Sequence, residues 1–414
     1  MILARYRPLL AVPGVRRALW LGLAIRTPMW AANVVLTLHV VGALHRSYGA
    51  AGVVTMAATI ALGISGPWRG RLLDRRGLRR MLAPCLAVNL VCWSAAPFLP
   101  FEALVPVVAL AGLYGIPAFS ITRQMMMAAT PLDQRTAVLS LESVALEVSF
   151  MIGPALGVLL LTWWPTTWVL LGCQLGAWAG GLALWWANPS LQHEDETDGP
   201  EVAAAATSTK ATEAAEITEG SAPADPRRVR PLWLTAPVPA MLGISTATVL
   251  LLVGSDLSIV AALRAMGHPA SIGLMLTLWG AGSAIGGVIY GGLHRRMSPV
   301  WLLAGLALTT LPAALADGPV VFGALMVLAG LFCAPTLTAT VDELSRVVPL
   351  ARRGEAMGWQ SGATTAGSAL GAPVAGFAID QAGWQGGLTL TALVGLAVSL
   401  AAGSASAVGR RRRR

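Results

Sequence analysis

Four ionisable side chains lie inside long apolar stretches of the sequence: Arg26, Glu142, Glu147 and Asp256. If these stretches cross a lipid bilayer, a charge near its centre costs roughly 2.5–3.5 kcal/mol on insertion scales, so the residue normally faces a cavity or a partner of opposite charge. Such groups can bind a proton, a cation or a counter-ion. They are therefore the first functional candidates.

The depth of each group along its helix separates the two glutamates. Counted from Arg135 at about 1.5 Å per residue, Glu142 lies about 10 Å and Glu147 about 18 Å into a helix. Arg26 lies about 12 Å into a helix that starts near Ala18, so its depth predicts an ion pair with Glu142. Glu147 has no base at its own depth, and removal from water disfavours an ionised carboxylate. It is the main candidate for proton coupling, with Glu142 second; a neutral, hydrogen-bonded structural role is the alternative for Glu147.

The composition shows which solvent surrounds these stretches. Of 414 residues, 55% are hydrophobic and only 12% are charged, against about 25% charged in ordinary soluble proteins, and the mean hydropathy is +0.66. A soluble globular enzyme is excluded. Apolar runs long enough to span a bilayer begin near twelve positions: Leu19, Ala50, Met81, Ala103, Ala137, Thr167, Ala236, Ala270, Val300, Val320, Ala356 and Gly387. The sequence predicts an all-α polytopic membrane protein with twelve transmembrane helices.

Basic residues predict the orientation, because loops rich in Lys and Arg stay on the cytoplasmic side. With the N-terminus inside, 26 of the 29 Lys and Arg residues fall in the tails and inner connections. We expect a multi-pass protein of the inner (plasma) membrane with both termini in the cytoplasm. The net charge of +9 is scattered over short clusters, which does not favour nucleic-acid binding.

A change of composition divides the chain into two halves. Residues 188–232 are acidic and rich in Ala and Thr, with few large apolar side chains, and such a segment is predicted to be a disordered linker. The expected domains are a six-helix bundle over residues 1–187, the cytoplasmic linker 188–232, a second bundle over 233–409 and a basic tail over 410–414.

The two halves are related by an internal repeat. At an offset of 218 residues, positions 107–157 share 12 identities in 51 with their counterparts. The matching pairs include Gly112 with Gly330 and Gly153 with Gly371. Because glycine, proline and loop arginine dominate the matches, we expect the halves to share helix shape and topology as two pseudo-symmetric bundles.

The connection between the second and third runs carries a recognisable motif. It reads Gly70-Arg71-Leu72-Leu73-Asp74-Arg75-Arg76-Gly77-Leu78-Arg79-Arg80. With one substitution, this resembles the signature loop of the major facilitator superfamily, Gly-x-Leu-x-Asp-Arg-x-Gly-Arg-Arg. We expect Gly70 to allow close helix approach, Gly77 to allow a tight turn, and Asp74 to form ion pairs at a helix end.

The resemblance covers essentially the whole chain and implies the fold of that superfamily, with alternating access between two halves. In the family this loop acts as a conformational latch, which implies a gating role here for Gly70, Asp74, Arg75, Gly77, Arg79 and Arg80. Gly153, Pro154 and Gly157 are similar to a motif that the family's antiporters place in helix five. Pro154 should bend the helix and the glycines should pack across the interface between halves, or serve ordinary helix packing. The family's buried helix-four arginine, seen in many drug antiporters, is missing.

The family also suggests which residues face the substrate. Arg26, Trp30, Asn33 and Thr37 share one face of helix one, and first helices of each half line the cavity in this family. Asp256, Gln360 and Thr364 are further cavity candidates; for the polar pair in helix eleven, hydrogen bonding between helices is the alternative.

Other functions are disfavoured by missing motifs. The single lysine, Lys210, lies in the linker and there is no P-loop, so ATP-driven transport is excluded. The sequence also lacks catalytic, haem-attachment and metal-binding patterns, so we expect neither an enzyme nor a cofactor. The prediction is a secondary transporter, monomeric in the lipid bilayer, that exports small apolar or cationic molecules in exchange for protons. Proton-symport or facilitated uptake of a metabolite, and a transporter-like sensor or scaffold, are the alternatives.

Overall fold

The computed structural model describes residues 9–131, 134–189, 237–292, 297–349 and 352–411, and over these residues the chain forms helices and no strands. Most of the predicted linker 188–232 lies outside the described residues. The last helix continues to Arg411, so the segment 410–414 begins inside a helix, and its side chains also lie outside the described part.

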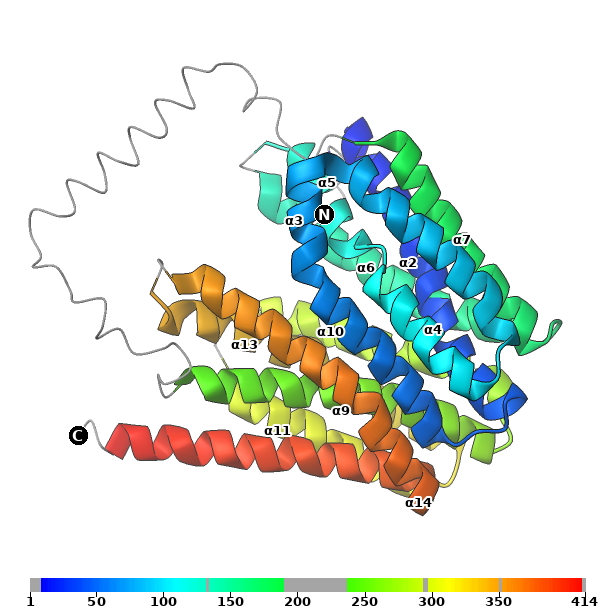
Figure 1. Ribbon diagram of the computed structural model, residues 1–414. Helices are drawn as coiled ribbons and strands as arrows, with labels where there is room; N and C mark the ends of the chain where they lie inside the picture. The colour runs from blue at the N-terminus through cyan, green and yellow to red at the C-terminus, as the bar shows by residue number, and fades with distance from the viewer. Residues whose placement is uncertain (1–8, 132–133, 190–236, 293–296, 350–351, 412–414) are drawn as a thin grey trace, which may run out of the picture.

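Each half of the chain supplies one helical bundle (Figure 1). The N-terminal bundle contains α2 (Pro13–Leu38, continued by a π-helix His39–Ala43), α3 (Tyr48–Ala95), α4 (Phe101–Leu113), α5 (Ala118–Ala128), α6 (Arg135–Leu160) and α7 (Thr166–Ala187). The C-terminal bundle contains α9 (Pro237–Ala265), α10 (Ile272–Gly292), α11 (Pro299–Thr310), α12 (Pro319–Gly330), α13 (Cys333–Val347) and α14 (Arg353–Arg411).

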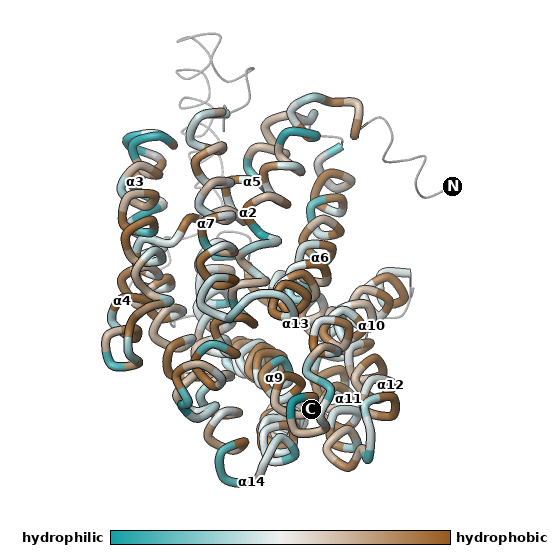
Figure 2. The backbone as a smooth tube through the Cα atoms, turned by 90° about the vertical axis from the view of Figure 1, so that its right-hand side faces the viewer, coloured by the Kyte–Doolittle hydropathy of each residue, from teal (hydrophilic) through white to brown (hydrophobic). Residues whose placement is uncertain are grey.

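The described helices can be divided into twelve candidate membrane crossings. Ten segments are long and apolar enough to span a membrane. One of them, Arg353–Ser404, holds two helices joined at Gly383, where φ is +69°, and Pro299–Leu315 is a shorter apolar helix. The first crossing begins at Pro13, six residues before the predicted Leu19. Figure 2 shows the hydrophobic middles of the helices and hydrophilic segments gathered at their ends.

Two of the crossings are broken in the middle. The fourth consists of α4 and α5, separated by residues 114–117, and the tenth consists of α12 and α13. Arg69 of α3 donates to the carbonyl oxygen of Gly115, a backbone acceptor in the connection between α4 and α5. The break is thus supported by a side chain of the neighbouring helix.

The internal repeat is visible in equivalent helix contacts. A Cβ added at Gly112 would overlap Ala58 of α3, and one added at its counterpart Gly330 would overlap Trp279 of α10. Glycine therefore allows the fourth crossing to approach the second, and the tenth to approach the eighth, at the same place in each bundle.

The two bundles meet at one end and diverge toward the other. We call the end where α7 finishes and α9 begins the linker end, and the opposite end the far end. In Figure 1 the bundles converge at the lower right, which is the far end, and separate toward the top and left. Contacts across this interface are made mainly by α3 with α14 and by α6 with α10.

Candidate functional site

The first interface helix pair, α6 and α10, is in contact from the far end to about its middle. A Cβ at Gly273 would lie 2.5 Å from the Cα of Ala155, so the backbones touch there. Further along, the Thr277 hydroxyl donates to the Met151 carbonyl oxygen over 2.9 Å, and Gly280 packs against Met151 and Phe150. These are the contacts that join the two bundles on this side.

The second pair, α3 and α14, shows the same pattern. Gly52 packs directly on the backbone of Pro373, and a Cβ at Gly63 would lie 2.9 Å from Cγ2 of Thr365. Closer to the linker end, a Cβ at Gly66 or at Gly362 would meet no heavy atom within 4 Å. The two helices therefore separate beyond Thr365.

Glu147 lies one helical turn beyond Met151, the last contact of the first pair described above. It is half-buried and follows Ala155 and Met151 at intervals of four residues, so it continues the face of α6 that contacts α10. Within the described residues no hydrogen bond or ion pair of Glu147 occurs. At the 218-residue offset its counterpart is Thr365, the residue at which the second pair separates.

A second carboxyl group lies across the interface from Glu147. Asp256 of α9 is half-buried, its Oδ1 is buried without a hydrogen-bond partner among the described residues, and Trp279 is its polar neighbour. Cys333, at the start of α13, lies close enough to both Asp256 and Glu147 to interact with their charges. One acid from each bundle is thus a neighbour of Cys333.

The predicted ion pair between Arg26 and Glu142 is present and belongs to a larger cluster. Arg26 Nη2 lies 3.0 Å from Glu142 Oε1, and both side chains are 2% exposed. Arg123 Nε lies 3.0 Å from the other carboxylate oxygen, while Arg26 also donates to Thr122 and lies over the ring of Phe119 at 5.1 Å. Glu142 therefore forms ion pairs with two guanidinium groups, which disfavours a role for Glu142 in proton coupling.

Arg123 is the residue of this cluster that the sequence reasoning misplaced. The assignment of basic residues to connections puts it between the fourth and fifth crossings, whereas it lies on α5, one residue after Thr122. Its side chain is 55% exposed, so the fourth crossing does carry an arginine, though not a buried one.

The four residues of the stripe predicted on helix one, which is α2 in the structure, have different surroundings. Arg26 is buried in its ion pair and does not line an open space, which corrects the expectation for this residue. Trp30 packs edge-on against Phe150 with ring centroids 5.0 Å apart, and its indole N–H is buried without a described partner. Asn33 is exposed, and Thr37 donates to its carbonyl oxygen.

The two polar candidates in α14 differ in their contacts. Gln360 is 6% exposed and donates to the Ser245 hydroxyl over 2.7 Å, so it links α14 to α9 and is not an accessible cavity residue. Gln360 corresponds to Glu142 in the repeat, and Ser245 is next to Ile244, the counterpart of Arg26. Thr364 is half-buried and donates to the carbonyl oxygen of Ser361.

Among the described side chains of the signature loop, that of Arg79 makes an anchoring contact. Arg79 donates to the carbonyl oxygens of Trp185 and Trp186 at 3.2 and 3.1 Å, so it caps the end of α7 in its own bundle. Gly77 has φ +76° and makes the expected turn. Gly70 has no heavy atom within 4 Å of a Cβ position, so the expected close approach is absent. Arg75 and Arg80 are exposed, and the side chain of Asp74 lies outside the described part.

The helix-five motif packs within one bundle, and the expectation of packing between halves is wrong. A Cβ at Gly153 would lie 2.6 Å from the Thr27 carbonyl oxygen, and one at Gly157 would crowd Ala31, both in α2. Pro154 lies inside α6. The repeat counterpart of Gly153, Gly371, packs in the same way on Leu250 of α9.

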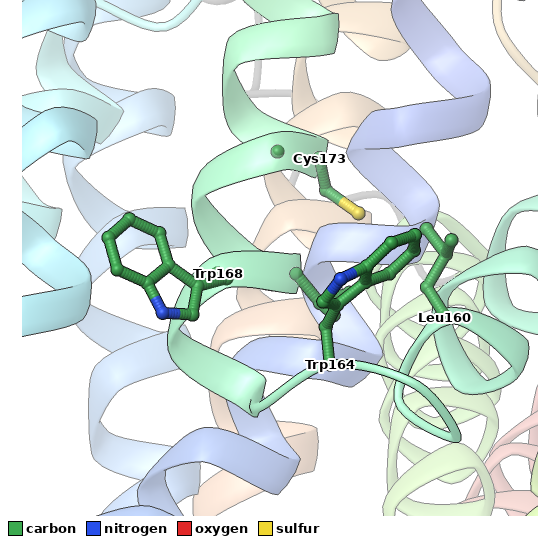
Figure 3. A pocket seen from close by; sticks show the side chains of 6 residues that line it. Leu160, Trp164, Trp168 and Cys173 are labelled. Atoms are coloured by element: carbon green, nitrogen blue, oxygen red, sulfur yellow. The ribbon is translucent and has the colours of Figure 1, made fainter.

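An apolar pocket of about 500 Å³ lies elsewhere, between the end of α6 and the start of α7 (Figure 3). It is lined by Leu160, Trp164, Trp168, Val169, Gly172 and Cys173. These residues lie on the N-terminal bundle alone, away from the interface. Among the described residues no group of His, Cys, Asp or Glu is arranged to hold a metal ion, and all four cysteines are free and buried.

Comparisons with known proteins agree with this architecture. A family model described as Major Facilitator Superfamily matches residues 19–263 and 240–412. A mutant of the nucleoside transporter NupG has a TM-score of 0.71 at 11% identity, over 94% of this chain and 99% of that one. A bacterial homologue of the iron transporter ferroportin, in its inward-facing state, has a TM-score of 0.64 at 15% identity, over 95% and 98% of the chains. A bacterial homologue of the human lysosomal transporter Spinster, inward-facing and unoccupied, has 0.64 at 14% identity, over 95% and 96%. No curated protein matches the sequence.

Proposed function

Because the chain belongs to the Major Facilitator Superfamily, a family of membrane transporters, we propose that it exports a small apolar or cationic molecule in exchange for protons. The route is alternating access, in which the two bundles open a shared path to one side of the membrane at a time. The signature loop from Gly70 to Arg80 is proposed to act as the latch of this motion.

The proposal depends mainly on the surroundings of Glu147. An ionised carboxylate in a low-dielectric environment is costly unless it is paired, and no cation pairs with Glu147 among the described residues. It also lies one helical turn from the contact of Met151 with Thr277, so a change of contact between the bundles changes its surroundings directly. A group in that place can take a proton from one side and release it to the other.

The neighbours of Glu147 support the proposed substrate class. Asp256 brings a second carboxyl group without an ion pair among the described residues, whereas Arg26 is neutralised by Glu142. Aromatic rings lie on the same stretch of α6 and its neighbour α2, where Phe150 packs edge-on against Trp30. Unpaired acids beside aromatic rings favour a cation or an apolar molecule over an anion.

The packing of the bundles supports alternating access. They touch along the far-end halves of both helix pairs and have no described contact at Gly66 or Gly362 toward the linker end. If the termini are cytoplasmic, as the distribution of arginine predicts, this is an inward-facing arrangement closed to the outside.

The test is a transport assay with a matched carboxylate control. An efflux-deficient bacterial host expressing the protein is expected to accumulate less of a panel of cationic dyes, and a protonophore should reverse this. In proteoliposomes, Glu147→Gln should abolish dye exchange driven by a pH gradient while dye binding and folding persist. Glu102→Gln, which removes an exposed carboxylate paired with Arg46, should leave exchange unchanged.

Two results would contradict the proposal. Proton-driven exchange that survives in Glu147→Gln would remove this residue as the proton carrier. Higher accumulation in expressing cells would instead make the protein an uptake carrier, the alternative direction.

A further inference from the structure

The far end of the interface holds a contact between bundles that involves none of the residues above. Asp380 lies near the end of the first helix of α14. Its carboxylate accepts hydrogen bonds from the backbone N–H groups of Tyr48 at 2.9 Å and Gly49 at 2.8 Å, the first two residues of α3. The first N–H groups of a helix have no partner inside it and carry partial positive charge. Asp380 therefore caps a helix of the other bundle.

This cap differs from the one that α3 supplies for itself. The Ser47 hydroxyl accepts from the Ala50 N–H over 3.1 Å, which is a local contact that persists wherever α3 moves. The two bonds to Asp380 join residues more than 330 positions apart. They exist only while the bundles meet at this end.

The backbones around Asp380 are built for this approach. A Cβ at Gly49 would lie 2.7 Å from Asp380 Oδ2, and a Cβ at Gly376 would overlap the backbone of Tyr48. Arg264, at the end of α9, is a polar neighbour of the Tyr48 side chain and adds a further contact between the bundles. Glycine on both helices thus lets the carboxylate reach the helix terminus.

We propose that Asp380 is a positioning residue of the transport cycle, which closes the far end of the path by capping α3 and releases it when that end opens. The inference rests on the alternating access of the proposed function. Charge-assisted hydrogen bonds are stronger than neutral ones, which favours the closed arrangement. Asp380 is exposed, so its carboxylate regains water on release and the latch is reversible.

The experiment measures opening at both ends with cysteine reporters. Met56 lies on the face of α3 that carries Gly49, Gly52 and Gly63, so Met56→Cys reports opening at the far end. Gly358→Cys reports the linker end, where a Cβ would meet nothing within 4 Å. The native cysteines are buried, so a membrane-impermeant maleimide labels mainly the introduced cysteine. It is applied to whole cells for Met56→Cys and to inside-out vesicles for Gly358→Cys.

Asp380→Ala should raise the labelling rate at Met56→Cys by about tenfold, as expected for the loss of hydrogen bonds to a charged group, and should lower it at Gly358→Cys. Asp380→Asn should fall between, since its amide oxygen still accepts one bond. Asp317→Ala removes an exposed carboxylate from the same end, with no described bond to the other bundle, and should change neither rate.

Opposite changes at the two reporters support the latch. Unchanged labelling of Met56→Cys in both Asp380 variants, or a rise at both reporters together, overturns it. These rates need neither a substrate nor a proton gradient. The latch proposal can therefore fail while Glu147-dependent exchange is still observed. Equally, the latch can be supported while Glu147-dependent exchange is absent.

Discussion

At the scale of residues, two glutamates on one helix have opposite environments. Glu142 and Glu147 are five positions apart, so they point about 140° away from each other around α6. Glu142 faces Arg26 inside the N-terminal bundle, whereas Glu147 continues the face that contacts α10. The same side chain is thus a structural counter-ion at one position and a candidate proton carrier at the other.

Removing the charge of Glu142 should destabilise the protein. Glu142→Gln leaves the Arg26 guanidinium buried beside a neutral group, and breaking a buried ion pair from one side costs about 3–5 kcal/mol. Thermal unfolding of the purified protein measures the effect. Glu355→Gln, which breaks the exposed pair with Arg352, should cost only about 0–1 kcal/mol, and equal losses in the two variants would contradict the structural role of Glu142.

At the scale of elements, the two bundles repeat one kind of helix contact. Gly153 brings α6 onto the backbone of Thr27 in α2, and Gly371 brings α14 onto the backbone of Leu250 in α9. The repeat offset of 218 residues that relates these glycines therefore has a packing reason. Small residues at such crossings let transmembrane helices approach closely.

Bulky substitutions at these two glycines should have matched effects. Gly153→Val and Gly371→Val each force a side chain against a neighbouring backbone, and such overpacking costs about 1–3 kcal/mol. Gly172→Val, where a Cβ would meet nothing within 4 Å, is the control. The melting temperature of each variant measures the effect. A lower melting temperature for only one of Gly153→Val and Gly371→Val would argue against equivalent contacts.

At the scale of the whole molecule, two helix pairs close one end and separate at corresponding residues. Thr365 on one side and Glu147 on the other are related by the repeat; Thr365 contacts the other bundle, and Glu147 lies one helical turn from the contact at Met151. A motion that opens the far end along the whole length of this contact would break the approach of Gly63 to Thr365.

A covalent link at that contact should stop transport. Cγ2 of Thr365 lies 2.9 Å from a Cβ position on Gly63, so cysteines at the two positions are within the Cβ separation of about 4.5 Å that a disulfide spans. Oxidation of the Gly63→Cys, Thr365→Cys double variant should abolish dye transport, and reduction should restore it. The single variants should not respond to oxidant, and full transport with the cross-link formed would exclude this opening motion.

Much of the architecture could be predicted from the sequence. Apolar runs of membrane-spanning length predicted the helices, the offset of 218 predicted the paired bundles, and the Gly70–Arg80 motif predicted the family that the comparison confirms. Depth along a helix also predicted that Arg26 and Glu142 meet. These features depend on composition, on the order of residues along the chain and on the rise per residue of a helix, and none of them requires the tertiary structure.

The tertiary structure alone decided which neighbour each helix face meets. It placed Arg26 inside a bundle instead of on a cavity wall, tied Gln360 to Ser245, and turned the helix-five glycines toward α2. It also put Asp380 on the first residues of α3, more than 330 positions away. Rise per residue determines how deep a side chain lies, but the packing of helices against one another determines what it touches.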